Sequence, residues 1–187
     1  MTQTITGVSQ TIASSAPDAG LYGPRGWTRN IGIRQLLAEG ADPPRDINLD
    51  EDDYWPFSKM THQQAKQLLE RLPERALRDT QNNGPELGSL LRAALTGPIE
   101  LSGYVIGPQR WDERLTVEAF TYWGRPNYHI VDPHCGQRHA DDCQCRQLFR
   151  DIAAELSLSG YESDPDEILP VSDPRDPQRK GWWLWWD

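Results

Sequence analysis

The sequence predicts an α+β fold, with helices in the first half of the chain and an antiparallel sheet after them. Between residues 61 and 97 the apolar side chains recur at helical spacing. From residue 101 to residue 123 the pattern changes to alternation with a period of two, which is typical of half-buried strands. A further helical pattern follows over 148–156. These changes of period predict N-terminal helices, an antiparallel β-meander and a closing helix.

Local start and stop signals place the N-terminal helices. A short helix is expected over 28–40, between a threonine cap and a glycine stop. The residues Thr-His-Gln-Gln at 61–64 match a capping box and predict a helix that ends at Pro73. The residues Gly-Pro-Glu at 84–86 open the next helix, with proline in its first turn, and Gly97 ends it.

The strands of the meander are expected on both sides of one turn. Residues 101–106 form the first strand, 107–113 the turn and 115–123 the returning strand. A glycine and a proline then make another turn, so that 128–131 forms a third strand. The closing helix ends near Gly160.

The remaining segments divide the chain into a domain and two ends. Residues 1–21 are poor in large apolar side chains and are predicted to be a disordered tail, followed by one domain over 22–160. Within it, 41–53 reads as an acidic loop and 54–57 as an aromatic plug. Residues 161–187 are expected to form an acidic, proline-rich tether that ends in a tryptophan-rich strand.

The composition narrows the class of function. The chain has 187 residues and a net charge of -9, so a general nucleic-acid binder, which needs a cationic face, is not expected. An acidic surface favours a protein partner with a cationic surface. No apolar run is long enough to span a membrane, and the N-terminus has no signal-peptide pattern, which predicts a cytoplasmic protein.

All three cysteines and three of the four histidines fall within residues 129–145. Thiolate and imidazole groups side by side are the ligands that zinc prefers. The sequence therefore predicts a zinc knuckle between the last strand of the meander and the closing helix. Its expected ligands are Cys135, His139, Cys143 and Cys145, with His134 as the competitor for the histidine position.

Three other interpretations of this cluster remain open. In one, the three cysteines are reduced and pack as small hydrophobic residues without metal. In the second, the metal is catalytic, which requires an open coordination position and a nearby acid or base such as Asp132, Asp141, Asp142 or His129. In the third, a cysteine is a nucleophile with a histidine as its base, although metal ligation explains all three cysteines and a nucleophile explains one. No zinc-deaminase signature is present, and three thiolates are typical of structural zinc.

Two segments that contain tryptophan are candidate contact surfaces. Arg110, Trp111 and Arg114 lie in the turn of the hairpin, where they either contact a partner or, in the case of Trp111, fold back onto the sheet. At the C-terminus, strand geometry places Trp182, Leu184 and Trp186 on one face and Trp183 and Trp185 on the other. We expect this strand to pack back on the sheet.

No catalytic residues are assigned, because the sequence contains no motif for nucleophilic, phosphate-binding or dinucleotide-dependent chemistry. The predicted function is binding of a protein partner by a small acidic protein with structural zinc. In composition, the chain is analogous to an inhibitor, an immunity protein or a phage-encoded protein. The alternative function is a metal-dependent hydrolase that uses the Cys/His cluster.

Overall fold

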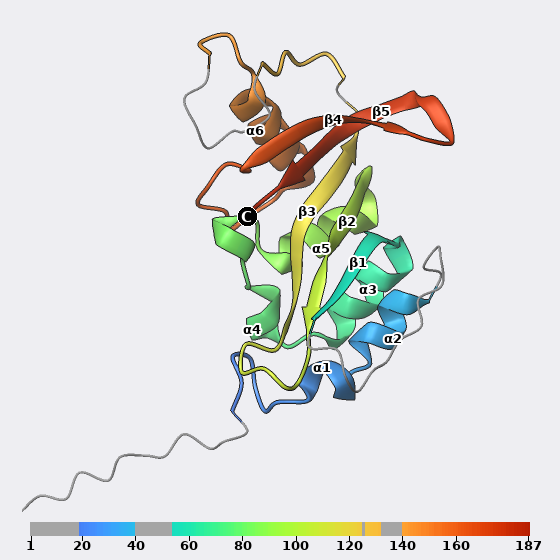
Figure 1. Cartoon of the computed structure of the whole chain (residues 1–187), viewed down its shortest axis with the longest axis vertical. Coiled ribbons are helices and arrows are strands. Elements are labelled where there is room, and N and C mark those ends of the chain that lie inside the picture. Colours follow the sequence, from blue (N-terminus) through green and yellow to red (C-terminus); the bar gives the residue numbers. More distant parts are fainter. Residues whose placement is uncertain (1–18, 40–53, 125, 132–139) are drawn as a thin grey trace, which may run out of the picture.

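A computed structural model describes residues 19–39, 54–124, 126–131 and 140–187. They form a five-stranded antiparallel sheet with helices on one face, which confirms the predicted α+β class (Figure 1). The elements in chain order are α1 (Trp27–Asn30), α2 (Ile33–Ala38), β1 (Tyr54–Met60), α3 (His62–Arg71), α4 (Glu74–Leu77), the 3-10 helix η1 (Gln81–Asn83), α5 (Leu87–Thr96), β2 (Ile99–Ile106), β3 (Arg114–Trp123), α6 (Cys145–Leu156), β4 (Glu167–Asp173) and β5 (Asp176–Trp185).

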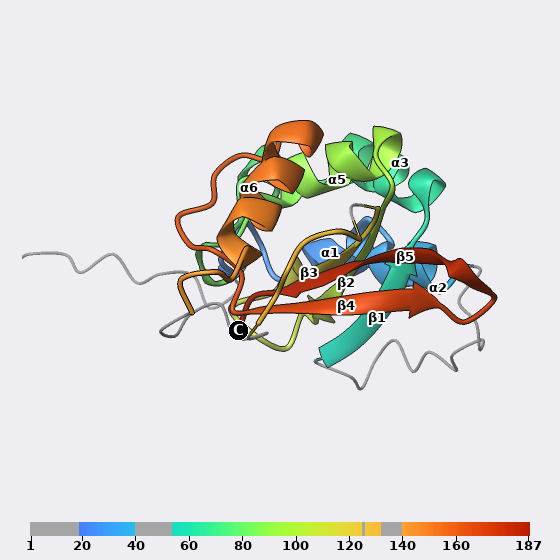
Figure 2. The same ribbon diagram turned by 90° about the horizontal axis from the view of Figure 1, so that it is seen from above.

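The strands lie in the order β1-β2-β3-β5-β4, and every neighbouring pair is antiparallel. Figure 2 shows α3, α5 and α6 as one layer above the sheet. None of these three helices lies on the opposite side of the sheet, which we call the open face. The fold is therefore two-layered, and alternate strand residues face either the helices or the open face.

The core lies between the sheet and the helix layer. Leu101 and Val105 of β2 and Leu115 and Phe120 of β3 are fully buried on the side facing the helices. Each such side chain contributes about 1.5–3 kcal/mol when it is removed from water. The period-two pattern that predicts these strands thus reflects burial of one face.

A side-chain cap fixes the start of α3, whereas α1, α2, α4 and α5 have no side-chain cap hydrogen bond. The predicted capping box is present, because Thr61 Oγ1 accepts a hydrogen bond from the Gln64 backbone and Gln64 Oε1 accepts one from the Thr61 backbone. The Gln64 amide also donates to the carbonyls of Leu36 and Glu39 and ties α3 to the end of α2. The single helix predicted over 28–40 is instead α1 and α2, interrupted at Gly32, whose φ of 72° is left-handed.

Three predictions of local structure were wrong. The aromatic plug at 54–57 belongs to edge strand β1, and the expected tether contains edge strand β4 and the first half of β5. Residues 128–131, expected as a strand, have no regular structure. Most of the predicted tail 1–21 and the acidic loop 41–53 lie outside the described residues.

The C-terminal strand packs on the sheet as predicted. β5 pairs with β3 on one side and β4 on the other, so it is an inner strand. Trp182, Leu184 and Trp186 are buried against the helix layer. Trp183 and Trp185 are on the open face, where their rings are stacked with centroids 6.1 Å apart. The alternation predicted for this segment is confirmed.

Candidate functional site

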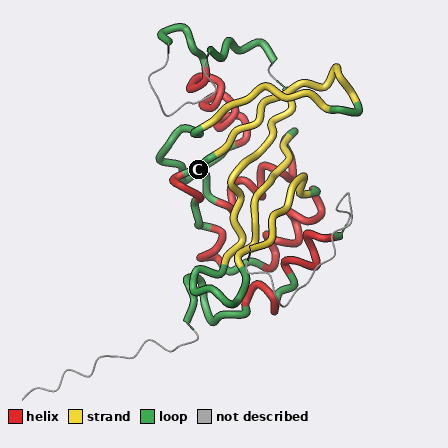
Figure 3. Tube along the Cα trace, in the orientation of Figure 1, coloured by secondary structure: helices red, strands yellow, loops and turns green. Residues whose placement is uncertain are grey.

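The tip of the β2–β3 hairpin carries the most exposed large hydrophobic side chain that the structure describes. Trp111 is 66% exposed, and it does not fold back onto the sheet. The Trp111 carbonyl accepts a hydrogen bond from the Leu21 backbone, and Leu21 is itself an exposed apolar residue. Figure 3 shows the two loops together, at the end of the molecule opposite α6. The tip therefore presents an indole to solvent on a loop with a second loop behind it.

Asp112 organises the charged residues around this indole. Arg110 donates two hydrogen bonds to the Asp112 carboxylate, at 2.8 and 2.7 Å, and Arg114 approaches the same group at 3.2 Å. The Arg110 hydrogen bond is the main reason why the pKa of Asp112 lies below its usual range. Arg110 and Arg114 thus hold the turn in shape, besides being available for contact.

A buried carboxylate fastens the tip to the N-terminal loop. Glu113 has no exposed surface, and it accepts hydrogen bonds from the backbone of Gly26 at 2.6 Å and of Thr28 at 2.8 Å. The Thr28 hydroxyl and the Trp27 indole also donate to Glu113, the latter to its carbonyl. These contacts join residues more than eighty positions apart in the chain. The position of Trp111 is therefore set by a buried polar network.

The predicted zinc ligands are only partly described. His134, Cys135 and His139 lie outside the described residues. Cys145 is buried at the first position of α6, and Cys143 is half-buried against the core. Within the described ranges, no three His, Cys, Asp or Glu side chains come together as a metal site. Cys145 is thus the first residue of the closing helix and Cys143 lies just before it, while their ligation of zinc stays a prediction.

Hydrogen bonds join the chain on either side of the segment 132–139. The His129 backbone N–H donates to the Gln144 side chain, and the Gln144 backbone N–H donates to the His129 carbonyl, both at 2.8 Å. Nearby, the His129 imidazole lies 3.6 Å from Asp142, with both side chains largely exposed. The two ends of the predicted knuckle are thus held next to each other.

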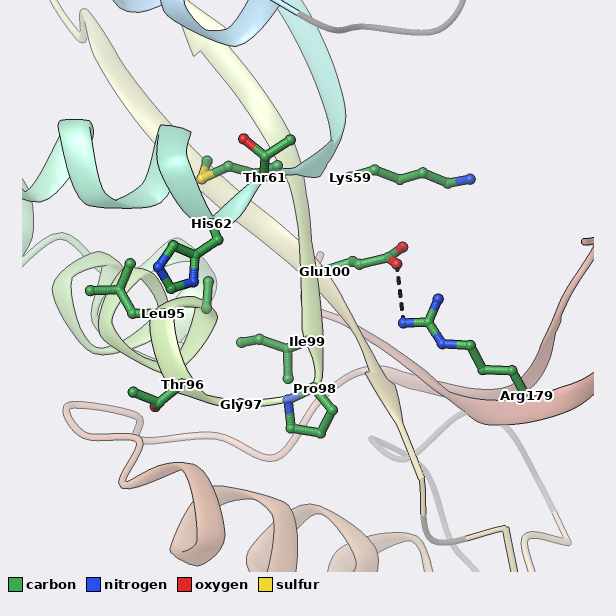
Figure 4. Close-up of a pocket in the computed structure, with 12 residues that line it drawn as sticks. Lys59, Thr61, His62, Leu95, Thr96, Gly97, Pro98, Ile99, Glu100 and Arg179 are labelled. Carbon is green, nitrogen blue, oxygen red and sulfur yellow. Dashed lines mark ion pairs between the residues drawn. The ribbon is translucent and has the colours of Figure 1, made fainter. Parts of the chain in front are cut away.

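A cavity of about 200 Å³ opens on the open face of the sheet. The two edge strands line it, with Lys59 from β1 and Asp173 from β4, together with the inner strands β2 and β3. A second hollow of about 410 Å³ adjoins it and shares Lys59 and Glu100. Figure 4 shows Lys59 and Glu100 extending side by side, while His62 points toward Leu95 of α5.

Arg179 of β5 lines the second hollow and pairs with two carboxylates that line the cavity. It forms ion pairs with Asp173 at 3.0 Å and Glu100 at 3.6 Å, the second of which is drawn in Figure 4. Its guanidinium also lies 4.3 Å from the centre of the Trp123 ring, within the range of cation–π attraction. Both carboxylates at the cavity are therefore already engaged by Arg179.

The sequence analysis did not find this cavity. Its residues come from four strands, and two of those strands were not predicted. One signal was present, because two of the three lysines of this acidic chain, Lys59 and Lys180, lie at the cavity or next to it.

The chain matches no protein-family model, no curated protein and no solved structure. Across the ranges that the structure covers, no helix has both the length and the apolar character needed to cross a membrane.

The geometry described above leaves three candidate sites, which are the exposed hairpin tip, the predicted knuckle and the cavity on the open face.

Proposed function

We propose that this protein acts by binding a protein partner, in the manner of an inhibitor or immunity protein, and that Trp111 is the central contact. The observation that carries the proposal is the 66% exposure of Trp111 on a loop held by ion pairs and a buried carboxylate. Exposed tryptophans on fixed loops are typical interface anchors. A loop that is already ordered also loses little conformational entropy when it binds.

The charge of the molecule supports a cationic partner. The whole chain carries -9, whereas the tip itself has two arginines, Arg110 and Arg114, around one paired carboxylate, Asp112. We therefore propose that the overall negative field of the protein attracts the cationic partner and that the Trp111 indole makes the central contact with it. Because steering is screened by salt, the association rate should fall as ionic strength rises, with a smaller change in the dissociation rate.

We also propose that Cys135, His139, Cys143 and Cys145 bind a structural zinc ion. The hydrogen bonds between His129 and Gln144 support this, because they already close the segment that carries the ligands. Cys145 begins α6, where the positive end of the helix favours a thiolate. Elemental analysis of protein purified without added metal should give one zinc per chain, and Cys143→Ser should lower that content.

The binding proposal is tested by comparing three forms of the protein in the same purification from the native host. Trp111→Ala should lose the specific partner, because it removes the anchor without touching Glu113 or Asp112. Leu169→Ala is the matched control, since Leu169 is also an exposed apolar residue but lies on β4. A partner recovered equally with wild type and Trp111→Ala would remove Trp111 from the interface.

A further inference from the structure

We propose that the cavity on the open face binds the oxyanion group, a phosphate or a carboxylate, of a small polar ligand. The central residues are Lys59 and Trp123, and Arg179, which lines the adjoining hollow, pairs with the two carboxylates of the cavity. This site is separate from the hairpin tip, because Lys59 lies at the end of β1 near the β4–β5 hairpin, whereas Trp111 lies in the β2–β3 turn.

Lys59 is the cation of this cavity whose carboxylate neighbours are both ion-paired with another residue. Arg179 takes both Glu100 and Asp173, and Lys59 forms no ion pair with any of the described residues. Its ammonium nevertheless lies close enough to Asp173 to help lower the pKa of that carboxyl, after the larger effect of the Arg175 backbone hydrogen bond. An anion at the cavity would supply the missing partner.

The backbone of Lys59 is held in an unfavourable conformation. Its φ of 55° is left-handed, at the bulge where β1 shifts its register on β2 between Phe57 and Met60. A residue with a Cβ atom is disfavoured there relative to glycine. Such strain often marks a residue whose side chain is needed in one place. Here the bulge turns Lys59 to the lining of the cavity.

The remaining polar groups of the cavity can all donate hydrogen bonds, although its hydroxyl groups can also accept them. The Trp123 indole N–H is buried and has no hydrogen-bond acceptor in the part of the chain that is described. Hydroxyl groups of Ser58, Ser102 and Thr121 also line the cavity. Because the two carboxylates are already paired, the unsatisfied demand is for an acceptor with negative charge.

The size of the cavity suits such a group. The volume of about 200 Å³ accommodates a small polar ligand.

The test is a titration followed by the indole N–H resonances in NMR spectra, with the Trp123 resonance identified by its loss in Trp123→Phe. Inorganic phosphate and succinate are the two probes, and chloride at equal ionic strength is the control. A saturable shift of the Trp123 resonance, with a dissociation constant of about 10 mM or lower, is expected for at least one probe. The probe that binds identifies the ligand as phosphorylated or as a carboxylate, and binding of both supports a general oxyanion site.

Two lysine variants separate a site from general charge attraction. Lys59→Met keeps the aliphatic stem and should weaken binding at least about tenfold, whereas Lys66→Met on α3 should leave it unchanged. Lys59→Gly should abolish binding and raise the melting temperature, because it relieves the left-handed backbone. The proposal is overturned if neither probe shows saturation up to about 50 mM, or if the Lys59 and Lys66 methionine variants weaken binding equally.

Discussion

The hairpin tip and the C-terminal strand both carry tryptophans, but the tryptophan of the tip is exposed whereas two of those in or next to the strand are buried. Trp111 is 66% exposed, whereas Trp182 and Trp186 are 4% and 2% exposed. Trp186 packs between Phe120 of β3 and Phe149 of α6, with ring centroids 5.8 and 5.6 Å away. At the tip, the fixed parts are the backbone and the charged residues around the indole, while the indole itself packs little.

The carboxylates in the two regions have pKa values that are shifted in opposite directions. Arg110 holds the pKa of Asp112 below its usual range, because the arginine stabilises the charged form. Burial raises the pKa of Glu118, although a hydrogen bond with the Trp185 side chain opposes the change and the nearby charge of Asp187 adds to it. The tip is therefore organised by paired charges, and the C-terminal region by removal of groups from water.

This difference separates stability from binding. The buried indoles of β5 hold the sheet to α6, so their removal should be costly to folding. Trp111 contributes little packing, yet Glu113 and Asp112 hold its loop in one conformation. An exposed indole on an ordered loop has a physical use in recognition rather than in the core. The variants below are ordered by their expected effect on folding stability.

Trp186→Ala should have the largest effect. It removes a fully packed indole from between two phenylalanines and leaves a cavity, so the free energy of unfolding should fall by about 3–5 kcal/mol. Urea denaturation followed by circular dichroism measures it. Trp183→Ala is the control, because Trp183 lies on the open face of the same strand, and it should lower the free energy of unfolding clearly less. Equal losses for the two variants would contradict the assignment of faces.

Glu113→Gln should have the next largest effect. The amide keeps the shape of the side chain but weakens charge-assisted hydrogen bonds to Gly26 and Thr28, so the loss should be about 2 kcal/mol. Amide hydrogen exchange in residues 19–31 should also accelerate, because Glu113 fastens that segment to the tip. Asp112→Asn, which alters only the partly exposed ion pairs, provides the comparison. Unchanged exchange in the Glu113 variant would show that the tip is held by other contacts.

Glu118→Gln should change the pH dependence of stability by less than about 1 kcal/mol. Since burial raises the pKa of Glu118 above its ordinary value of 4.5, the folded state binds more protons than the unfolded state in the window just above pH 4.5. Stability therefore falls as the pH rises through this window. The glutamine variant should lack this decline and equal the wild type below it. Denaturation at about pH 4 and pH 7 compares them, and identical pH profiles would contradict the account.

Trp111→Ala should have the smallest effect on folding. Because Trp111 is largely exposed, its removal should change the free energy of unfolding by no more than about 0.5 kcal/mol. The same change should weaken partner binding by at least about thirtyfold, the size expected for an interface anchor. Calorimetry with the isolated partner measures the second quantity. A large loss of stability with unchanged affinity would place Trp111 with the buried indoles of β5.

The parts of the fold that were predicted from sequence are those with local signals. The capping residues Thr61 and Gln64 define the start of α3, and alternation defines β2 and β3. The two strands that were missed both contain proline, Pro56 in β1 and Pro170 in β4. Proline removes a backbone donor and argues against an inner strand, but both strands lie at the edges of the sheet, where the missing donor is tolerated.

The candidate sites depend more on the tertiary fold. Trp111 was identified from its place in a turn, but its exposure depends on Glu113 and Thr28, which are far apart in sequence. The cavity on the open face joins Lys59 to Asp173 from opposite edges of the sheet. The left-handed backbone of Lys59 also has no signature in the sequence, since lysine is not selected for that conformation.

The most direct test of the binding account is site-specific photo-crosslinking in the native host. A photoreactive phenylalanine derivative in place of Trp111 should crosslink one protein with a net positive charge. The same derivative in place of Leu169, an exposed position on β4, should not crosslink it. Addition of unlabelled wild-type protein should reduce the crosslink at position 111, whereas Trp111→Ala should not. No specific crosslink at position 111, or equal crosslinking from both positions, would contradict the assignment of Trp111 as the partner-binding residue.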